Sequence, residues 1–273
     1  MNPRALAVWV AAVLLLSLGS EDPVCRVLTL GAAVVVLAVR RRHEVRLRPA
    51  LLAVGAAAAL TILFNFLLSH TGQNIVVALP GWLPALGGPL TVEGAVYGFD
   101  IALGLAACLV AGITLSLVVE PHQLVDSLPA ALSHTGAAVG ASLTLVPRLG
   151  HSFVAVREAQ QMRGWRPRGL RSWTAVLVPS VLTTIEGSVL MAEAMEARAF
   201  GSGSRSALAT STWHPSDLLT ASAAGGAIVA FVLALVLGQI PSWQPYPTLL
   251  LPALNWWPAA CCLALFAPVL ARG

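Results

Sequence analysis

Two segments of the chain place charged residues in the same order and at the same spacing. The first reads EAQQMRG over 158–164, and the second reads EAMEARA over 193–199. In each segment Ala follows Glu, Arg stands five places after Glu, and a small residue comes last. The repeated positions are Glu158, Ala159, Arg163 and Gly164 in the first copy and Glu193, Ala194, Arg198 and Ala199 in the second. This repeat predicts that the two segments make equivalent contacts.

The chemistry that suits this pattern is recognition by arginine. On a helix, the Ala four residues before the Arg lies on the same face, and its small side chain lets another surface approach closely. The guanidinium is a planar fork with five hydrogen-bond donors. Either copy alone has a simpler explanation, because a cation favours a helix C-terminus and a following Gly caps the helix. Two matched copies 35 residues apart favour a pair of anchors for a partner with two equivalent grooves, such as a dimeric ATPase.

Composition indicates which elements position these segments. The chain has 273 residues, of which 57% are hydrophobic and 10% are charged, whereas an average soluble domain has about 25% charged residues. We therefore predict an all-α fold, a polytopic helical membrane protein. A transmembrane helix needs about 20 apolar residues. The sequence offers about six such helices, near 5–19, 24–39, 50–68, 96–119, 218–238 and 247–270.

The chain turns polar between the fourth and fifth predicted spans. We predict a cytoplasmic helical coupling domain there, with helices near 151–163 and 180–199. Gly164 followed by Pro167 is a usual pattern for ending a helix. The predicted domains are N-terminal transmembrane helices in 1–119, the coupling domain in 120–217 and C-terminal transmembrane helices in 218–273.

Residues 172–192 resemble a further span, but Pro179 and Glu186 interrupt the apolar run. If this segment crossed the bilayer, the two copies of the repeat would lie on opposite sides. Without a crossing, Arg26 is the only one of 16 arginines outside the cell. The excess of arginine expected on the cytoplasmic side therefore favours a helix that lies along the inner face or dips into it.

Arginine placement also sets the orientation of the spans. The loop 40–48 holds five arginines and is expected in the cytoplasm. Both termini are then cytoplasmic and the loop 69–92 is outside, with Trp82 at the interface. Asp100, near the outer end of its span, is expected to be an interfacial carboxylate.

Several functional classes are disfavoured by the residues that the chain lacks. All 16 basic residues are Arg, and the absence of Lys excludes a Walker A loop. Any ATP is therefore expected in partner chains. The four Cys show no CxxC spacing and the six His no HxxxH or HExxH spacing, so we expect no metal site and no catalytic residues. The basic pI is expected from cytoplasmic arginine, and nucleic acid is not an expected partner.

The two arginine triplets, Met162-Arg163-Gly164 and Ala197-Arg198-Ala199, resemble the paired signatures of one transporter family. This family comprises the transmembrane T components of energy-coupling factor (ECF) type ABC transporters, including the Q-type subunits of cobalt and nickel importers. The run AMEARAFGSGSR, which contains Glu196 and Arg205, is similar to the family's longer motif. Ala199 stands where the family usually has Gly, and we expect Gly201 to end the second helix instead.

The resemblance implies a scaffold in the plasma membrane of a bacterium. In this family the T component joins two ABC-type ATPase subunits to a small substrate-binding membrane subunit, the S subunit. The ATPases bind the ATP, so no cofactor is expected in this chain. The imported substrate would be a vitamin or a transition-metal ion, and the sequence does not say which.

Three other functions remain open at this point. A conventional ABC permease couples through a single loop that EAQQMRG resembles superficially, although the second copy argues against this. A membrane-embedded enzyme would have to use acids such as Asp100, Glu93 or Glu186, which show no catalytic spacing. A membrane assembly protein is the third alternative.

The predicted topology is testable by cysteine labelling. In a background that lacks the four native Cys, we expect a cysteine at Ser172 or Ser202 to react only with reagents that reach the cytoplasm. Labelling of Ser202→Cys from outside intact cells would mean that the segment between the two repeats crosses the bilayer.

Overall fold

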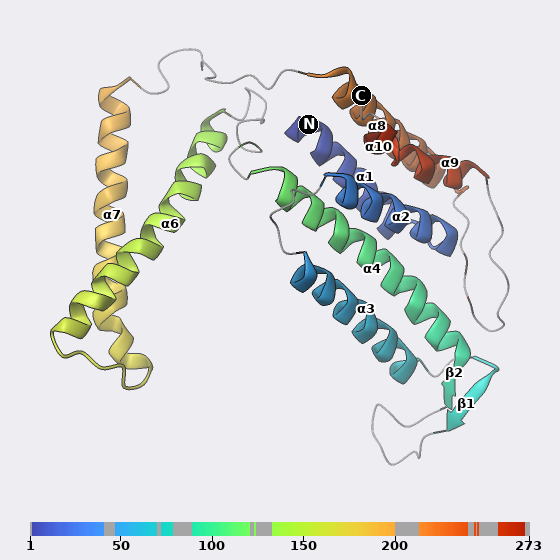
Figure 1. Ribbon diagram of the computed structural model, residues 1–273, viewed down its shortest axis with the longest axis horizontal. Coiled ribbons are helices and arrows are strands. Elements are labelled where there is room, and N and C mark those ends of the chain that lie inside the picture. The colour runs from blue at the N-terminus through green and yellow to red at the C-terminus, as the bar shows by residue number, and fades with distance from the viewer. Residues whose placement is uncertain are drawn as a thin grey trace. The chain divides into compact units, whose positions relative to one another are not determined.

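The computed structural model describes most of the chain in ten ranges. They are residues 2–40, 47–69, 72–78, 89–120, 123, 133–199, 213–239, 243, 245 and 256–270. The chain divides into two compact units, one made of Met1–Glu120 with Ser211–Gly273 and one of Pro121–Thr210 (Figure 1).

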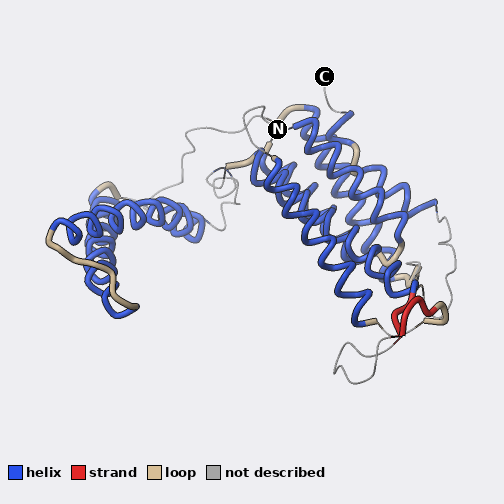
Figure 2. The backbone as a smooth tube through the Cα atoms, turned by 60° about the horizontal axis from the view of Figure 1, so that its bottom comes forward, coloured by secondary structure: helices blue, strands red, loops and turns tan. Residues whose placement is uncertain are grey.

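The first unit, which we call the membrane unit, is a bundle of apolar helices. Its long helices lie side by side in both views (Figures 1 and 2). α1 packs against α2, α4 and α8, and α3 packs against α4. The helices are α1 (Pro3–Gly19), α2 (Pro23–Arg40), α3 (Arg48–Leu68), α4 (Val92–Val118), α8 (Pro215–Val236), α9 (Trp256–Ala264) and α10 (Ala267–Leu270).

The core of the membrane unit is centred on α1. The largest of its fully buried side chains are Leu6, Trp9 and Leu16. Two polar side chains of α1 are hydrogen-bonded to other helices or their connections, because an apolar surrounding offers them no water. Trp9 Nε1 donates to the carbonyl of Leu265 over 2.8 Å, and Ser17 Oγ donates to the carbonyl of Gly104 over 2.9 Å.

Two short strands precede α4. These strands were not predicted from the sequence. β1 (Ile75–Ala78) pairs antiparallel with β2 (Pro89–Thr91). The fully buried Glu93 holds this hairpin, since its Oε1 accepts from the backbone N of Asn74 at 3.1 Å and from its Nδ2 at 2.9 Å. Trp82, the expected interfacial anchor, lies outside the described residues.

The helix lengths confirm the prediction of an all-α polytopic membrane protein. By length and composition, five helices in the described ranges could cross a membrane. Two shorter apolar helices, Pro3–Gly19 and Trp256–Val269, accompany them. The five are Pro23–Arg40, Arg48–Leu68, Val92–Val118, Arg171–Ala197 and Pro215–Val236.

The second unit, which we call the hairpin unit, contains two long helices joined by a short turn. They are α6 (Ser133–Met162) and α7 (Thr174–Ala197), with the 3-10 turn η2 (Leu170–Trp173) between them. Figure 1 shows that they cross near this turn and separate away from it. Aromatic rings fix the turn: Trp173 stacks on Phe153 with centroids 6.1 Å apart and meets the edge of Trp165 at 5.5 Å.

Both helices of the hairpin unit differ from the predicted bounds. The prediction that the first begins near 151 is wrong, because α6 begins at Ser133 and continues through Pro147. The second begins at Thr174 instead of 180, with Pro179 inside it. Pro179 has no N–H for the carbonyl of Ala175, and Gln160 Nε2 donates to that carbonyl over 3.4 Å instead. A contact from the neighbouring helix thus makes the proline tolerable.

A buried ion pair joins α2 to α4 in the membrane unit. Arg26 NH1 donates to Asp100 Oδ2, and Asp100 is 4% exposed. The expectation of an interfacial carboxylate at Asp100 is therefore wrong. Gly104 makes room for the arginine, because a Cβ at Gly104 would stand 3.3 Å from Arg26 Nε. The pair was missed because 74 residues separate its members.

This pair predicts a strongly non-additive response to mutation. Arg26→Leu or Asp100→Leu alone leaves the other charge buried without its partner, which should cost about 3–5 kcal/mol of unfolding free energy. The double variant, with two leucines packed together, should unfold close to the parent. Unfolding in mixed micelles measures this, and a loss in the double variant equal to the sum of the two single losses would contradict the pairing.

Candidate functional site

The first arginine of the repeat caps the end of α6. Arg163 is the residue after the last helical position, and Gly164 adopts a left-handed conformation with φ of 83°. The N–H of Trp165 bonds to the carbonyl of Gln160 at 2.9 Å, and that of Gly164 to the carbonyl of Gln161 at 3.0 Å. This is the Schellman pattern, which satisfies the last carbonyls of a helix. The predicted stop at Gly164 is confirmed.

The second arginine occupies the same position on α7. Arg198 is the C-cap residue, and Ala199 follows in the left-handed region with φ of 54°. The N–H of Ala199 bonds to the carbonyl of Glu196 at 2.8 Å, the bond that Gly164 makes at the first site. The prediction that α7 continues to 199 and that Gly201 ends it is wrong, since Ala199 takes that conformation itself. Gly201 lies outside the described residues.

Ala199 carries a conformational cost that Gly164 does not. Among the described residues, Ala199 is the only one other than glycine with positive φ. A Cβ crowds the following carbonyl in this region and costs roughly 1–2 kcal/mol. The end of α7 is therefore less stable than it would be with glycine at this position. The third residue of each triplet therefore has a backbone role, which is to turn the chain immediately after the arginine.

Both guanidinium groups are available to a partner. Arg163 and Arg198 are exposed, and Met162 is 84% exposed beside the first of them. Within the described ranges, neither guanidinium forms a salt bridge or a hydrogen bond. Ten N–H donors, five on each arginine, are thus free to bind acceptors outside this part of the chain.

The two sites lie at opposite ends of the hairpin unit. Arg163 stands at the turn, whereas Arg198 stands at the far end of α7, which has 24 residues. At 1.5 Å per residue the length of α7 is about 36 Å. The fold therefore does not bring the two arginines together, and one acceptor group cannot meet both.

The supporting residues of the repeat lie on the last turns of the same helices. Ala159 is half-buried, and its carbonyl accepts from the N–H of Arg163 at 3.2 Å, which places the two residues one helical turn apart. The other supporting positions are exposed. They are Glu158, Glu193, Ala194 and Glu196, with Ala197 beside Arg198. Arg205 falls outside the described residues.

The acidic residues considered for an enzyme do not form a cluster. Glu93 accepts hydrogen bonds from Asn74, Asp100 pairs with Arg26, and Glu186 lies exposed in the hairpin unit. Across the described ranges, no three His, Cys, Asp or Glu side chains are placed to hold a metal ion.

The bundle of long apolar helices defines a multi-pass helical membrane protein. The chain belongs to the CbiQ cobalt transport protein family, whose model matches residues 1–207. This is the T component family that the arginine triplets indicated, and the match covers both triplets. The chain is accordingly a membrane subunit of a transporter. A search among curated proteins found no match.

The two helix ends predict opposite effects of small substitutions. Ala199→Gly should stabilise the end of α7 by about 1 kcal/mol, and Gly164→Ala should destabilise that of α6 by a similar amount. Gly150→Ala is the matched control, because Gly150 lies inside α6 with open space around it, where alanine should stabilise by about 0.5–1 kcal/mol.

Amide hydrogen exchange on the full-length chain measures these effects locally. Exchange near the end of α6 should speed up in Gly164→Ala and slow down in Gly150→Ala. The left-handed cap would be refuted if both Gly→Ala substitutions protected the helix alike.

Proposed function

We propose that this chain is the coupling scaffold of an ECF-type ABC importer. In this proposal Arg163 and Arg198 each bind one cytoplasmic ATPase subunit, and a small S subunit in the membrane binds the substrate. The observation that carries the proposal is the pair of exposed, equivalently capped arginines at opposite ends of one helical hairpin. ATP is bound and hydrolysed by the partner chains, and this chain holds no cofactor.

The chemistry at each helix end favours a groove lined with oxygen acceptors. An arginine fork binds carboxylates in a bidentate manner, and hydrogen bonds with a charged donor are stronger than neutral ones. Because the left-handed residue turns the backbone away immediately after the arginine, the helix end is blunt. A blunt end with a projecting guanidinium can enter a groove on a second protein.

The separation of the arginines favours two ATPase subunits over one. Arg163 lies near the turn and Arg198 at the far end of α7, a helix about 36 Å long. Sites so placed would reach two related grooves of an ATPase dimer. The ring cluster of Phe153, Trp165 and Trp173 holds the helices at their turn. A nucleotide-driven movement of one ATPase relative to the other would then tilt or shear the hairpin, and so pass motion to the membrane subunits.

The proposed position of the hairpin unit is along the inner face of the membrane. Both arginines can face the cytoplasm only if α7 does not cross, although α7 is long and apolar enough to do so. Exposed apolar side chains such as Leu182, Ile185 and Leu190 would then rest on lipid or on the S subunit. The C-terminal and N-terminal ends of the chain remain cytoplasmic in this proposal.

The proposed substrate class is a transition-metal ion or a vitamin. The family description, cobalt transport, favours a metal ion. The metal is cargo in this scheme and is selected by the S subunit, so the scaffold needs no metal ligands of its own.

The double variant Arg163→Ala/Arg198→Ala tests the proposal. Truncating one member of a buried charged pair costs about 2–5 kcal/mol, which is roughly 30- to several-thousand-fold in affinity. Because two anchors on one scaffold raise the effective concentration, each single variant should keep the ATPases bound but couple them poorly. The double variant should release them in a pull-down and lose substrate uptake.

The matched control is Arg157→Ala/Arg171→Ala, which removes two exposed arginines of the hairpin unit outside the triplets. It should assemble and transport as the parent does. Arg→Lys at the triplets should rescue only in part, since an ammonium group lacks the planar fork. If the double Ala variant assembles and transports at the parent level, the arginines are only helix caps.

A further inference from the structure

Two exposed arginines that the proposed function does not use lie in the loop between α6 and η2. Residues 163–171 hold four arginines and no acidic residue. Arg163 is an ATPase anchor in the proposed function, whereas Arg166 and Arg168 have no role in it. Both are exposed, and neither guanidinium forms a salt bridge or a hydrogen bond in the part of the chain that the structure describes. The loop therefore offers two cationic groups to a ligand.

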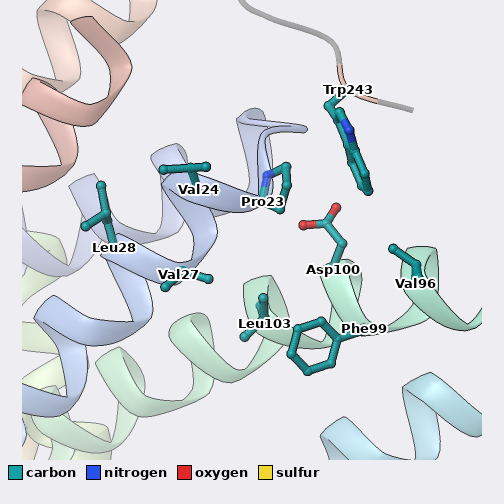
Figure 3. A pocket seen from close by; sticks show the side chains of 9 residues that line it. All are labelled: Pro23, Val24, Val27, Leu28, Val96, Phe99, Asp100, Leu103 and Trp243. Carbon is teal, nitrogen blue, oxygen red and sulfur yellow. The ribbon is translucent and has the colours of Figure 1, made fainter. Parts of the chain in front are cut away.

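The buried ion pair of the membrane unit is not available to a ligand in this way. Asp100 lines an apolar cavity of about 310 Å³ between α2 and α4 (Figure 3), but its carboxylate is paired with Arg26. Asp100 is 4% exposed, so a group in the cavity cannot reach the pair. A charged ligand is therefore bound more readily by the exposed arginines of the loop.

Hydrogen bonds to Ser172 fix the backbone of this loop. The Oγ of Ser172 accepts from the N–H of Arg168 at 2.9 Å and donates to the carbonyl of Gly169 at 2.8 Å. The carbonyl of Ser172 accepts from Trp165 Nε1 at 3.0 Å. Gly169 has a φ of 72°, a conformation that glycine adopts without strain. A loop that is ordered in advance loses little entropy when a ligand binds.

An apolar helix follows the loop directly. The stretch Arg171–Ala197 is long and apolar enough to cross a membrane, and side chains such as Leu177 and Leu182 are exposed on it. If α7 crosses the bilayer, its N-terminal end lies at the level of the lipid head groups. If α7 lies along the surface instead, that end lies at the same level. In both cases the loop stands beside phospholipid head groups.

The residue types in and around the loop suit this position. Arginine binds phosphate groups through two parallel hydrogen bonds, and tryptophan is enriched at the interface between membrane and water. The rings of Trp165 and Trp173 meet edge to face beside the loop. Because residues 163–171 contain no acidic residue, the cation of a zwitterionic head group would be repelled. The loop therefore favours head groups with a net negative charge.

We propose that Arg166 and Arg168 bind the phosphate groups of anionic phospholipids at the surface of the membrane that holds this chain. The proposal leaves Arg163 and Arg198 to the ATPases and does not depend on that binding, because it concerns the loop and the lipid alone.

The experiment uses the full-length chain without ATPases, in nanodiscs that contain equal amounts of phosphatidylglycerol and phosphatidylcholine with the same acyl chains. A diazirine amino acid replaces the exposed Pro167, which stands between the two arginines. Mass spectrometry of the irradiated protein counts the lipid adducts. Each arginine near an anionic surface contributes about fivefold in affinity. Phosphatidylglycerol adducts should therefore exceed phosphatidylcholine adducts at least about fivefold.

Two variants at the same positions identify the cause of this excess. Arg166→Gln/Arg168→Gln removes both charges and should lower the ratio of the two adducts at least about fivefold. Arg166→Lys/Arg168→Lys is the matched control, because it keeps both charges, and it should retain most of the excess. The proposal is overturned if no lipid is captured, as expected of a loop that meets only proteins. It is also overturned if the two lipids are captured equally, or if the Gln and Lys variants lose the excess alike.

Discussion

The last carbonyl groups of a helix need hydrogen-bond donors. In this chain, backbone N–H groups just after α6 and α7 supply them, and this arrangement places an arginine at the tip of each helix. At the ends of α6 and α7 the backbone turns into the left-handed region one residue after the arginine, at Gly164 and at Ala199. The resulting hydrogen bonds close the helix and leave the guanidinium exposed at its tip. The same short motif therefore does two things at once, since it ends the helix and presents a five-donor fork. The cost at Ala199 indicates that the backbone conformation is kept even where the residue does not favour it.

The two units satisfy their polar groups in different ways. The membrane unit joins some of its buried polar side chains to other parts of the bundle, as Trp9 to Leu265 and Arg26 to Asp100. In the hairpin unit the arginines of the triplets have no such partners within the described ranges. The triplet arginines are exposed and are therefore available to groups outside the described ranges. The proposed binding of ATPase subunits requires this availability.

Much of this organisation could be predicted from the sequence because its signals are local. Apolar runs of about 20 residues predicted the long helices, and the spacing Glu-Ala-x-x-x-Arg predicted matched helix ends. The start of α6 was missed since Pro147 and several glycines look like helix breakers, while Pro179 in α7 is tolerated through a hydrogen bond from Gln160. The pairing of Arg26 with Asp100 depends on residues 74 positions apart. No local pattern indicates such a contact. Nothing in the sequence around Gly104 shows that this glycine makes room for Arg26.

In the proposed assembly the two capped arginines engage two ATPase subunits at the same time, one at each end of the hairpin. A photo-crosslinking amino acid placed at both Met162 and Ala197, next to the arginines but not replacing them, tests this simultaneous engagement. Irradiation of the assembled transporter should give a covalent species with one scaffold chain and two ATPase chains, while either single position should give a species with one of each. If the doubly labelled scaffold never captures more than one ATPase, or captures none at Ala197, the two ends do not act as a pair and the proposed assembly is wrong.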